Sequence, residues 1–190
     1  IMLGADCAAS HWYDAESDRY RFEGEMRTRE EMMDFYRELV RDYPIVTLED
    51  PFNETDIAGF QMATKELGIQ IVGDDFFVTN PKIIKEKLPY NAANALLWKY
   101  NQVGTLTESF DAADIATHNG YGLMPSERSG ESEDIILADL VVALNAGQIK
   151  TGTLNRTERV AKYNRMTEIE AELGDEAVYA GRFFKNPCMK

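Results

Sequence analysis

Three acidic residues, Asp6, Glu49 and Asp74, each stand at the end of a short apolar run of the sequence. If these carboxylates meet, they repel one another unless a cation or a basic side chain lies among them. Carboxylate oxygens that leave room for water ligands are typical of a Mg²⁺ site. Any one of these acids could instead cap a helix after a strand-to-helix turn. Three acids in the same position after three successive runs indicate a Mg²⁺ site.

Two lysines, Lys99 and Lys150, also follow apolar runs. The alternative for either lysine is an exposed side chain whose stem covers apolar surface. Lys99 follows Leu-Leu-Trp and precedes Tyr-Asn-Gln, and a partly desolvated lysine more easily takes the neutral, basic form. A metal ion held by carboxylates beside a lysine base suits the removal of a proton from a carbon next to a carboxylate.

The stretch PSERSGESED, residues 125–134, places an arginine and serines beside a glycine turn. The guanidinium of Arg128 and the hydroxyl of Ser129 are groups that bind anions. A solvated acidic loop that caps the next helix is the alternative, but it leaves Arg128 and Ser129 unexplained. Glu127 adds a negative charge directly beside them. The stretch therefore predicts an anion site with a glutamate in it.

The elements that must position these residues alternate along the chain. Apolar runs bounded by turn residues predict strands at 1–3, 45–48, 69–72, 95–98, 122–125 and 147–149. Apolar residues at helical spacing predict helices at 29–42, 56–67, 81–87, 107–119, 132–144 and 156–173. Strands that alternate with helices form a parallel sheet with helices outside it.

The polar residues after the strands favour a (β/α) barrel, in which the chemistry gathers at the carboxyl ends of the strands. No strand is followed by G-x-G-x-x-G, which argues against a dinucleotide-binding sheet. A complete barrel needs eight strands and about 250 residues, whereas this chain has 190. We predict an α/β fold of the TIM-barrel type, as one domain spanning 1–190, with about six of the eight strands. Its two unpaired edges predict association into a homo-oligomer.

Composition limits the partners and the compartment. The net charge of -13, from 33 acidic and 20 basic residues, disfavours binding to nucleic acid. No apolar run is long enough to span a membrane. Cys7 and Cys188 lie near opposite ends without metal-type spacing, so two reduced thiols are favoured over a disulfide. These features fit a cytoplasmic location.

From residue 43 to residue 187 the sequence resembles the C-terminal part of enolases, the phosphopyruvate hydratases. The matching stretches are LEDPF (48–52), GIQIVGDD (68–75), VTNPK (78–82), LLWKYNQVGTLTES (96–109), RSGESED (128–134), ADLVVAL (138–144), GQIKTG (147–152), RTERVAKYNRMTEIEAELGDEA (156–177) and AGRFFKNP (180–187). Enolases are lyases of glycolysis that use Mg²⁺ to dehydrate 2-phosphoglycerate to phosphoenolpyruvate. The resemblance implies the barrel of this family without its N-terminal domain.

The resemblance also implies roles for single residues. It makes Asp6, Glu49 and Asp74 the ligands of the first Mg²⁺, and it makes Lys99 the general base that removes the C2 proton. Lys150 is the second residue expected to take part in catalysis, facing the substrate carboxylate and the ions. The residues expected to contact the substrate are Arg128, Ser129, Glu127, Lys150 and Glu49, with a second Mg²⁺ near Ser129.

Two departures from the family bear on activity. The family has histidine where this chain has Glu127, and a glutamate there should weaken phosphate binding unless it is protonated, turned away or paired with a base or metal. In the family the general acid, the N-terminal domain and the covering loops precede the matched segment, so we expect the isolated chain to be weakly active or inactive. Two alternatives are an enolase-related enzyme with an altered substrate, such as a phosphonate, and a non-catalytic protein that binds a partner through Lys190.

Overall fold

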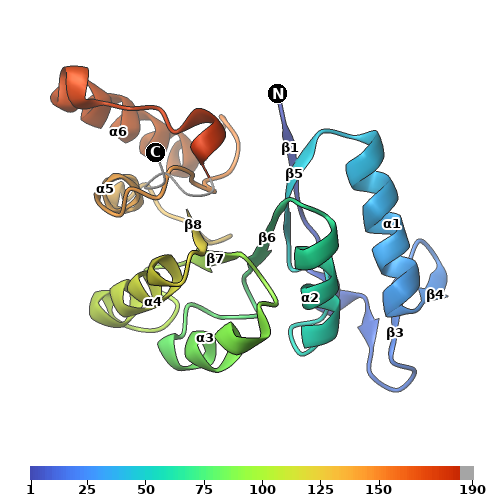
Figure 1. The fold of residues 1–190 in the computed structure, drawn as a ribbon. Coiled ribbons are helices and arrows are strands. Elements are labelled where there is room, and N and C mark those ends of the chain that lie inside the picture. Colours follow the sequence, from blue (N-terminus) through green and yellow to red (C-terminus); the bar gives the residue numbers. More distant parts are fainter. Residues whose placement is uncertain (185–190) are drawn as a thin grey trace.

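A computed structural model describes residues 1–184 of the chain, and its centre is a sheet of five parallel strands. The strands are β1 (Leu3–Asp6), β5 (Ile45–Glu49), β6 (Gln70–Gly73), β7 (Ala95–Trp98) and β8 (Gly122–Pro125). They are hydrogen-bonded in this order. The strands follow an arc, with α1 to α4 outside it (Figure 1). The described residues form an open sheet of the kind expected for an incomplete barrel.

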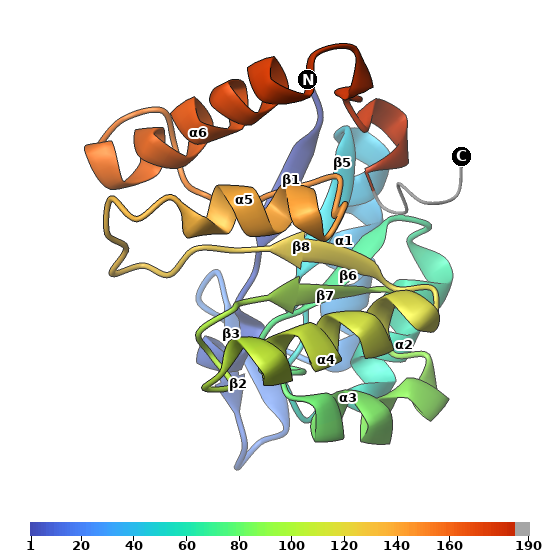
Figure 2. The same ribbon diagram turned by 90° about the vertical axis from the view of Figure 1, so that its left-hand side faces the viewer.

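Each strand of the arc except the last leads through a helix to the next strand. The helices are α1 (Arg29–Asp42), α2 (Ile57–Glu66), α3 (Pro81–Lys87), α4 (Leu106–His118), α5 (Ile136–Ala143) and α6 (Thr157–Leu173). Short 3-10 turns are η1 (Ala9–His11), η2 (Leu88–Tyr90), η3 (Gly174–Glu176) and η4 (Gly181–Phe183). Figure 2 shows α6 lying beside α5, next to the β8 end of the sheet. Among residues 1–184, no helix combines the length and the apolar character needed to cross a membrane.

Local sequence signals explain where the helices begin. The side chain of Thr28 accepts a hydrogen bond from the Glu31 amide, and the Glu31 side chain accepts one from the Thr28 amide, which closes a capping box at the start of α1. Asn80 caps α3, whose first residue is Pro81, a position where a missing amide hydrogen costs nothing. The predicted bounds of α1 and α3 are confirmed.

The first predicted strand, at 1–3, lies at Leu3–Asp6 in the structure, and the last predicted strand, at 147–149, is wrong. Residues 147–149 do not form a strand, because Gly147 has φ +74° and interrupts the extended backbone. Among the described residues, only an isolated bridge between Ser126 and Lys150 continues the sheet beyond β8. The structure also contains a three-stranded antiparallel sheet that was not predicted, formed by β2 (Tyr13–Asp14), β3 (Arg19–Phe22) and β4 (Glu25–Arg27). The sequence signal available for this sheet was Gly24, because Glu23 and Gly24 form the two-residue turn between β3 and β4 and both have positive φ.

The sheet has two unequal faces. Leu96 and Trp98 point toward the helices and belong to the main core, while Ala95 and Leu97 point to the other face. This other face, which we call the inner face, carries a small apolar cluster among the described residues. The cluster consists of Val72, Ala95 and Leu97 with Met124 packed against it. Thr47 Oγ1 and both polar atoms of the Gln70 side chain are buried and have no hydrogen-bond partner among the described residues. The inner face is therefore partly polar.

Gly73, the last residue of β6, lies against the ring of Phe77. A methyl group on Gly73 would lie 2.6 Å from one ring carbon of Phe77 and 2.8 Å from another. Phe77 is held in turn by an edge contact with Phe76, so the ring has little room to move. We expect Gly73→Ala to lower the free energy of unfolding by about 1 to 3 kcal/mol, measured by urea unfolding. Gly130→Ala is the control, since no atom lies within 4 Å of its added methyl group, and equal losses would contradict the packing argument.

Candidate active site

The predicted metal ligands lie at the carboxyl ends of neighbouring strands. Asp6 ends β1 and Glu49 ends β5, and the two residues are direct partners in the parallel register. Asp74 follows the end of β6, and Lys99 follows the end of β7. Strands that run in parallel bring these residues to one edge of the sheet, which is where catalytic residues of (β/α) barrels lie. We call these four residues together with Lys150 the rim.

Lys150 links the two acidic residues at the β1 end of the rim. Its Nζ donates hydrogen bonds to Asp6 Oδ2 at 2.7 Å and to Glu49 Oε2 at 2.8 Å. The backbone positions it, because the Lys150 amide donates to Pro125 O at 2.9 Å and its carbonyl accepts from the Glu127 amide at 3.0 Å. The structure therefore brings Lys150 into the same group as two of the predicted ligands.

Lys99 pairs with the third predicted ligand. Its Nζ lies 2.7 Å from Asp74 Oδ1 and 2.6 Å from Asp74 Oδ2. The two side chains are only 12% and 17% exposed, so this pair is largely withdrawn from water. The Lys99 amide donates to Thr79 Oγ1 at 3.1 Å, and Thr79 is fully buried. The lysine expected to act as base is thus held in a fixed place beside a carboxylate.

The rim has a distinctive electrostatic character. Burial raises the pKa of Glu49 to about 8, although Lys150 opposes the shift. Burial alone would lower the pKa of Lys150, but the charge of Glu49 and the hydrogen bonds to Asp6 and Glu49 outweigh it and raise the pKa. Beside the rim, burial raises the pKa of Asp50 to about 7. The Asp50 carboxylate accepts from the amides of Asp74 at 2.9 Å and Asp75 at 2.8 Å.

The donor set fits a hard divalent cation. Glu49 is 4% exposed, and its Oε1 atom has no hydrogen-bond partner among residues 1–184. A buried carboxylate oxygen without a partner is costly unless a cation or a donor reaches it. Oxygen ligands from carboxylates are those that Mg²⁺ prefers. The residues predicted as ligands, Asp6, Glu49 and Asp74, are therefore chemically suited to hold such an ion.

A second acidic group shares one residue with the predicted ligands. One carboxylate oxygen each from Asp50, Asp74 and Asp75 lies within 4.8 Å of the others, close enough for one cation. Asp50 was not among the residues predicted for the site, although it stands beside Glu49 in the run LEDPF. The signal that could have found it is structural: Asp50 has φ +41°, and its side chain organises the backbone of the Asp74–Asp75 turn.

The predicted anion-binding residues lie on the loop after β8. Arg128 and Ser129 are exposed, and Arg128 Nη1 donates to Asn101 Oδ1 at 3.2 Å. Glu127 is buried instead, and its carboxylate forms an ion pair with Arg159 of α6. Its other oxygen accepts from Thr151 Oγ1 at 3.2 Å. Of the conditions expected to make this glutamate tolerable, pairing with a base is the one that the structure shows.

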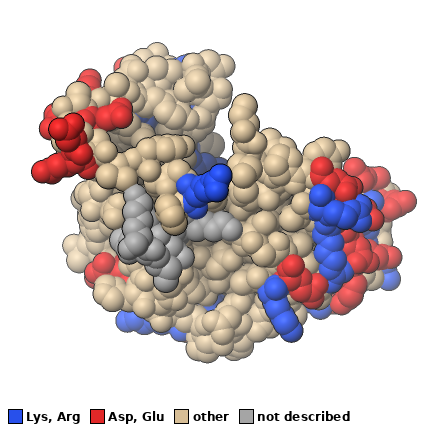
Figure 3. Space-filling view, turned by 45° about the horizontal axis from the view of Figure 1, so that its top comes forward, with Lys and Arg blue, Asp and Glu red and all other residues tan. Residues whose placement is uncertain are grey.

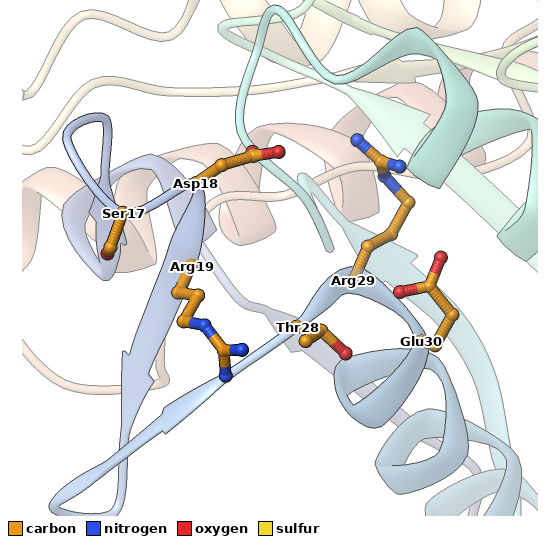
Figure 4. Close-up of a pocket in the computed structure, with 6 residues that line it drawn as sticks. All are labelled: Ser17, Asp18, Arg19, Thr28, Arg29 and Glu30. Atoms are coloured by element: carbon orange, nitrogen blue, oxygen red, sulfur yellow. The ribbon is translucent and has the colours of Figure 1, made fainter.

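Two hollows elsewhere on the surface do not compete with the rim. The first, of about 200 Å³, is lined by Ser17, Asp18, Arg19, Thr28, Arg29 and Glu30 (Figure 4). Its arginines are already engaged, since Arg29 pairs with Asp56 at 2.7 Å and Arg19 donates to a carbonyl. The second, of about 540 Å³, lies between β4 and α1 and is lined mainly by acids. Figure 3 shows acidic and basic side chains mixed over this side of the molecule.

The free energy of unfolding of the metal-free chain is expected to fall as the pH rises from about 5 to about 8. The pKa values of Glu49 and Asp50 are raised from 4.5 to about 8 and from 3.8 to about 7, so the folded chain binds more protons than the unfolded chain in this range. Their contribution is complete at low pH and is lost as the pH passes through the raised values. We expect a fall of about 1 to 3 kcal/mol, measured by urea unfolding with a chelator present.

The control for this pH dependence is Glu49→Gln, which removes one of the two titrating groups. We expect this variant to show a flatter profile that retains the part due to Asp50. A free energy of unfolding that stays constant or rises over the same pH range would contradict the prediction.

Parallel strands inside helices, with carboxylates and lysines at their carboxyl ends, define a (β/α)-barrel protein with a rim suited to metal and proton chemistry. Residues 1–188 match the family model for the enolase C-terminal TIM barrel domain. Curated relatives named "Enolase" are 55% identical over 187 residues in Methanocaldococcus jannaschii, 55% over 191 in Thermococcus gammatolerans and 56% over 188 in Methanococcus maripaludis strain S2. These matches cover 98%, 100% and 98% of this chain.

The chain belongs to the enolase family. The expected family and the TIM-barrel class are thereby confirmed. The chain spans 44% of the length of each of these relatives. The activity of the whole protein is consequently a matter for proposal.

Proposed function

We propose that this chain forms the metal-binding and proton-accepting part of an enolase site, which dehydrates 2-phosphoglycerate to phosphoenolpyruvate in glycolysis, in the cytoplasm. The observation that carries the proposal is the rim. Lys99 lies within 2.7 Å of both oxygens of Asp74, and Lys150 lies within 2.8 Å of Asp6 and Glu49. The relatives named "Enolase" support this assignment.

Each residue of the rim has a role in this proposal. Mg²⁺, when bound by Asp6, Glu49 and Asp74, would supply stabilisation for the negative charge that develops on the substrate carboxylate. Lys99 would accept the C2 proton, and the electrons of that C–H bond would pass first to the substrate carboxylate as an enediolate. They would then form the C2–C3 double bond as the 3-hydroxyl leaves with its bonding electrons as hydroxide. Lys150 would neutralise the substrate carboxylate.

The loop after β8 supplies the groups for the phosphate. Arg128 is exposed and offers a planar set of donors, while Ser129 offers a hydroxyl and an amide. The burial of Glu127 against Arg159 supports a phosphorylated substrate, because this glutamate is engaged away from Arg128. The same pairing weakens the argument for a phosphonate or another altered substrate. Lys190, the basis of the non-catalytic alternative, and Cys188 lie outside the described residues.

The proposal separates proton removal from departure of the hydroxyl. The resemblance to enolases implies that the general acid lies in a part of the family fold that precedes the matched segment. The lysines and carboxylates of the rim are those needed for proton removal alone. The chain should therefore exchange the C2 hydrogen of 2-phosphoglycerate with solvent more readily than it completes the dehydration. Loss of general acid catalysis typically costs about 10²- to 10⁴-fold in rate.

The test is the exchange of the C2 hydrogen with deuterium from D₂O, followed by proton NMR, with Mg²⁺ or with a chelator. Mg²⁺-dependent exchange supports the proposal. Absence of both exchange and phosphoenolpyruvate formation at saturating Mg²⁺ and substrate would overturn it for this chain.

We also propose that the chain associates through the sheet. β1 and β8 are the two ends of the strand order, and polar atoms of Thr47 and Gln70 on the inner face lack hydrogen-bond partners within residues 1–184. Unpaired edges and unsatisfied polar atoms favour contact with another surface. Light scattering over a range of concentrations measures this association, and a monomer at every concentration would exclude it.

A further inference from the structure

The ion pair of Glu127 and Arg159 is enclosed by the protein. The two side chains are only 7% and 15% exposed. One carboxylate oxygen of Glu127 contacts Arg159 Nη1, and the other accepts from the hydroxyl of the buried Thr151 at 3.2 Å. Both oxygens of the carboxylate are thus bound within the protein. Glu127 has no free oxygen to turn toward a ligand.

The backbone separates Glu127 from the residue that follows it. The Glu127 amide donates to Lys150 O at 3.0 Å, which continues the pairing of β8 with the segment at Lys150. Successive residues of extended backbone point to opposite sides. Glu127 accordingly faces the protein, whereas Arg128 is exposed and reaches Asn101.

A second cation of α6 contacts the same loop. Lys162 is 1% exposed, and its Nζ donates to Ser132 O at 2.6 Å and to Glu158 O at 2.8 Å. It also lies 3.5 Å from Glu131 Oε1. Lys162 follows Arg159 by about one turn of helix, so both cations project from one side of α6. The helix therefore fixes the loop 127–132 at both ends.

Gly152 leaves the space in which the pair lies. A methyl group at this position would lie 2.7 Å from Arg159 Nη1 and 2.9 Å from Glu127 Oε1, and it would also meet Arg159 Cδ. The backbone at Gly152 has φ +74°, a conformation that suits glycine. Gly152 stands two residues after Lys150, so the space that holds the pair adjoins the segment that carries this rim lysine.

We propose that Glu127 is a positioning residue whose charge is cancelled by Arg159, and that the pair fixes the loop so that Arg128 and Ser129 present a positive site to a phosphate group. This inference rests on the proposed function and deepens it. It assigns to Glu127 a role in positioning the loop and to Arg159 a role in charge balance.

Charge balance makes two substitutions act in opposite directions. Arg159→Met leaves the Glu127 carboxylate uncompensated, so inorganic phosphate should bind about 3- to 10-fold more weakly. Glu127→Gln leaves the Arg159 cation uncompensated, so phosphate should bind about 3- to 10-fold more tightly. The double variant restores neutrality and should return to the affinity of the unchanged chain.

Calorimetric titration of the four proteins with inorganic phosphate at low ionic strength tests the inference. Arg165→Met is the matched control, because Arg165 lies on the same helix but pairs with Asp139. A shift in the same direction for both single variants, or no shift in either, overturns the inference and leaves the C2 exchange reaction as evidence for the proposed function. Absence of phosphate binding by the unchanged chain overturns the phosphate site itself.

Hydrogen exchange of the amides at 126–132 gives an independent readout. Removing one member of a buried ion pair leaves an unpaired charge, whereas removing both is far less costly. We expect at least about 10-fold faster exchange in each single variant and recovery to within about 3-fold in the double variant. A single variant that fails to fold beside a folded double variant supports the coupling. Additive effects in the double variant overturn it.

Discussion

Lys99→Ala is expected to slow the exchange of the C2 hydrogen of 2-phosphoglycerate by about 10²- to 10⁴-fold. The proposed base is removed, while the carboxylates of the rim stay in place. Lys99 is the rim lysine that pairs with Asp74, and its side chain is 12% exposed. No water molecule in solution has the fixed position that this largely buried amine has. Proton NMR in D₂O measures the exchange at saturating Mg²⁺.

Lys85→Ala is the matched control for this loss, because Lys85 is an exposed lysine of α3, outside the rim. Its exchange rate should equal that of the unchanged chain. A second check separates base removal from unfolding: Lys99→Ala should retain Mg²⁺ binding. Undiminished exchange in Lys99→Ala would assign the base to another residue, and Lys150→Ala would then be the next variant to measure.

Glu49→Gln is expected to weaken Mg²⁺ binding by at least about 10²-fold, since loss even of groups that only support metal ligands costs about 10- to 100-fold. Glu49 is buried, and it is the rim carboxylate with an oxygen that lacks a hydrogen-bond partner among the described residues. Glutamine keeps the size of the side chain but removes its negative charge. Calorimetric titration of the chelator-treated chain with Mg²⁺ measures the change.

Asp75→Asn tests which of the two neighbouring acidic groups holds the metal ion. Asp75 belongs with Asp50 and Asp74 to the alternative group, but it is not one of the predicted ligands. If Asp6, Glu49 and Asp74 hold the ion, Asp75→Asn should change Mg²⁺ affinity far less than Glu49→Gln. The reverse order of effects would move the metal to the Asp50, Asp74 and Asp75 group.

The strands and helices that could be predicted are those whose own residues determine them. The continuous apolar run of β7 and the cap and proline of α3 are local signals, and both bounds were predicted correctly. The prediction failed at residues 147–149 because Gly147 adopts a positive φ that bends the chain. The antiparallel sheet of β2 to β4 was missed because its strands are very short and carry charged residues.

The position of the candidate residues at one edge of the sheet could be predicted from the sequence, but their pairing could not. Their shared position after parallel strands places Asp6, Glu49, Asp74 and Lys99 at one edge. The partner of each lysine depends on side-chain geometry across the sheet, which no spacing along the chain encodes. The pairing of Glu127 with α6 is a contact of the same kind, between elements distant in sequence. Charge alone suggested that Glu127 opposes an anion, whereas the fold supplies its cation.

The lysine pairs at the rim mean that the acidic residues carry their own counterions. Asp74 is neutralised by Lys99, and Glu49 and Asp6 share Lys150. If a divalent ion binds the oxygens of Asp6, Glu49 and Asp74, it would compete with these ammonium groups for the same atoms. Each ammonium that gave up its carboxylate would then be free to face an anionic ligand. Under the proposed function, the metal would therefore bind before the ligand.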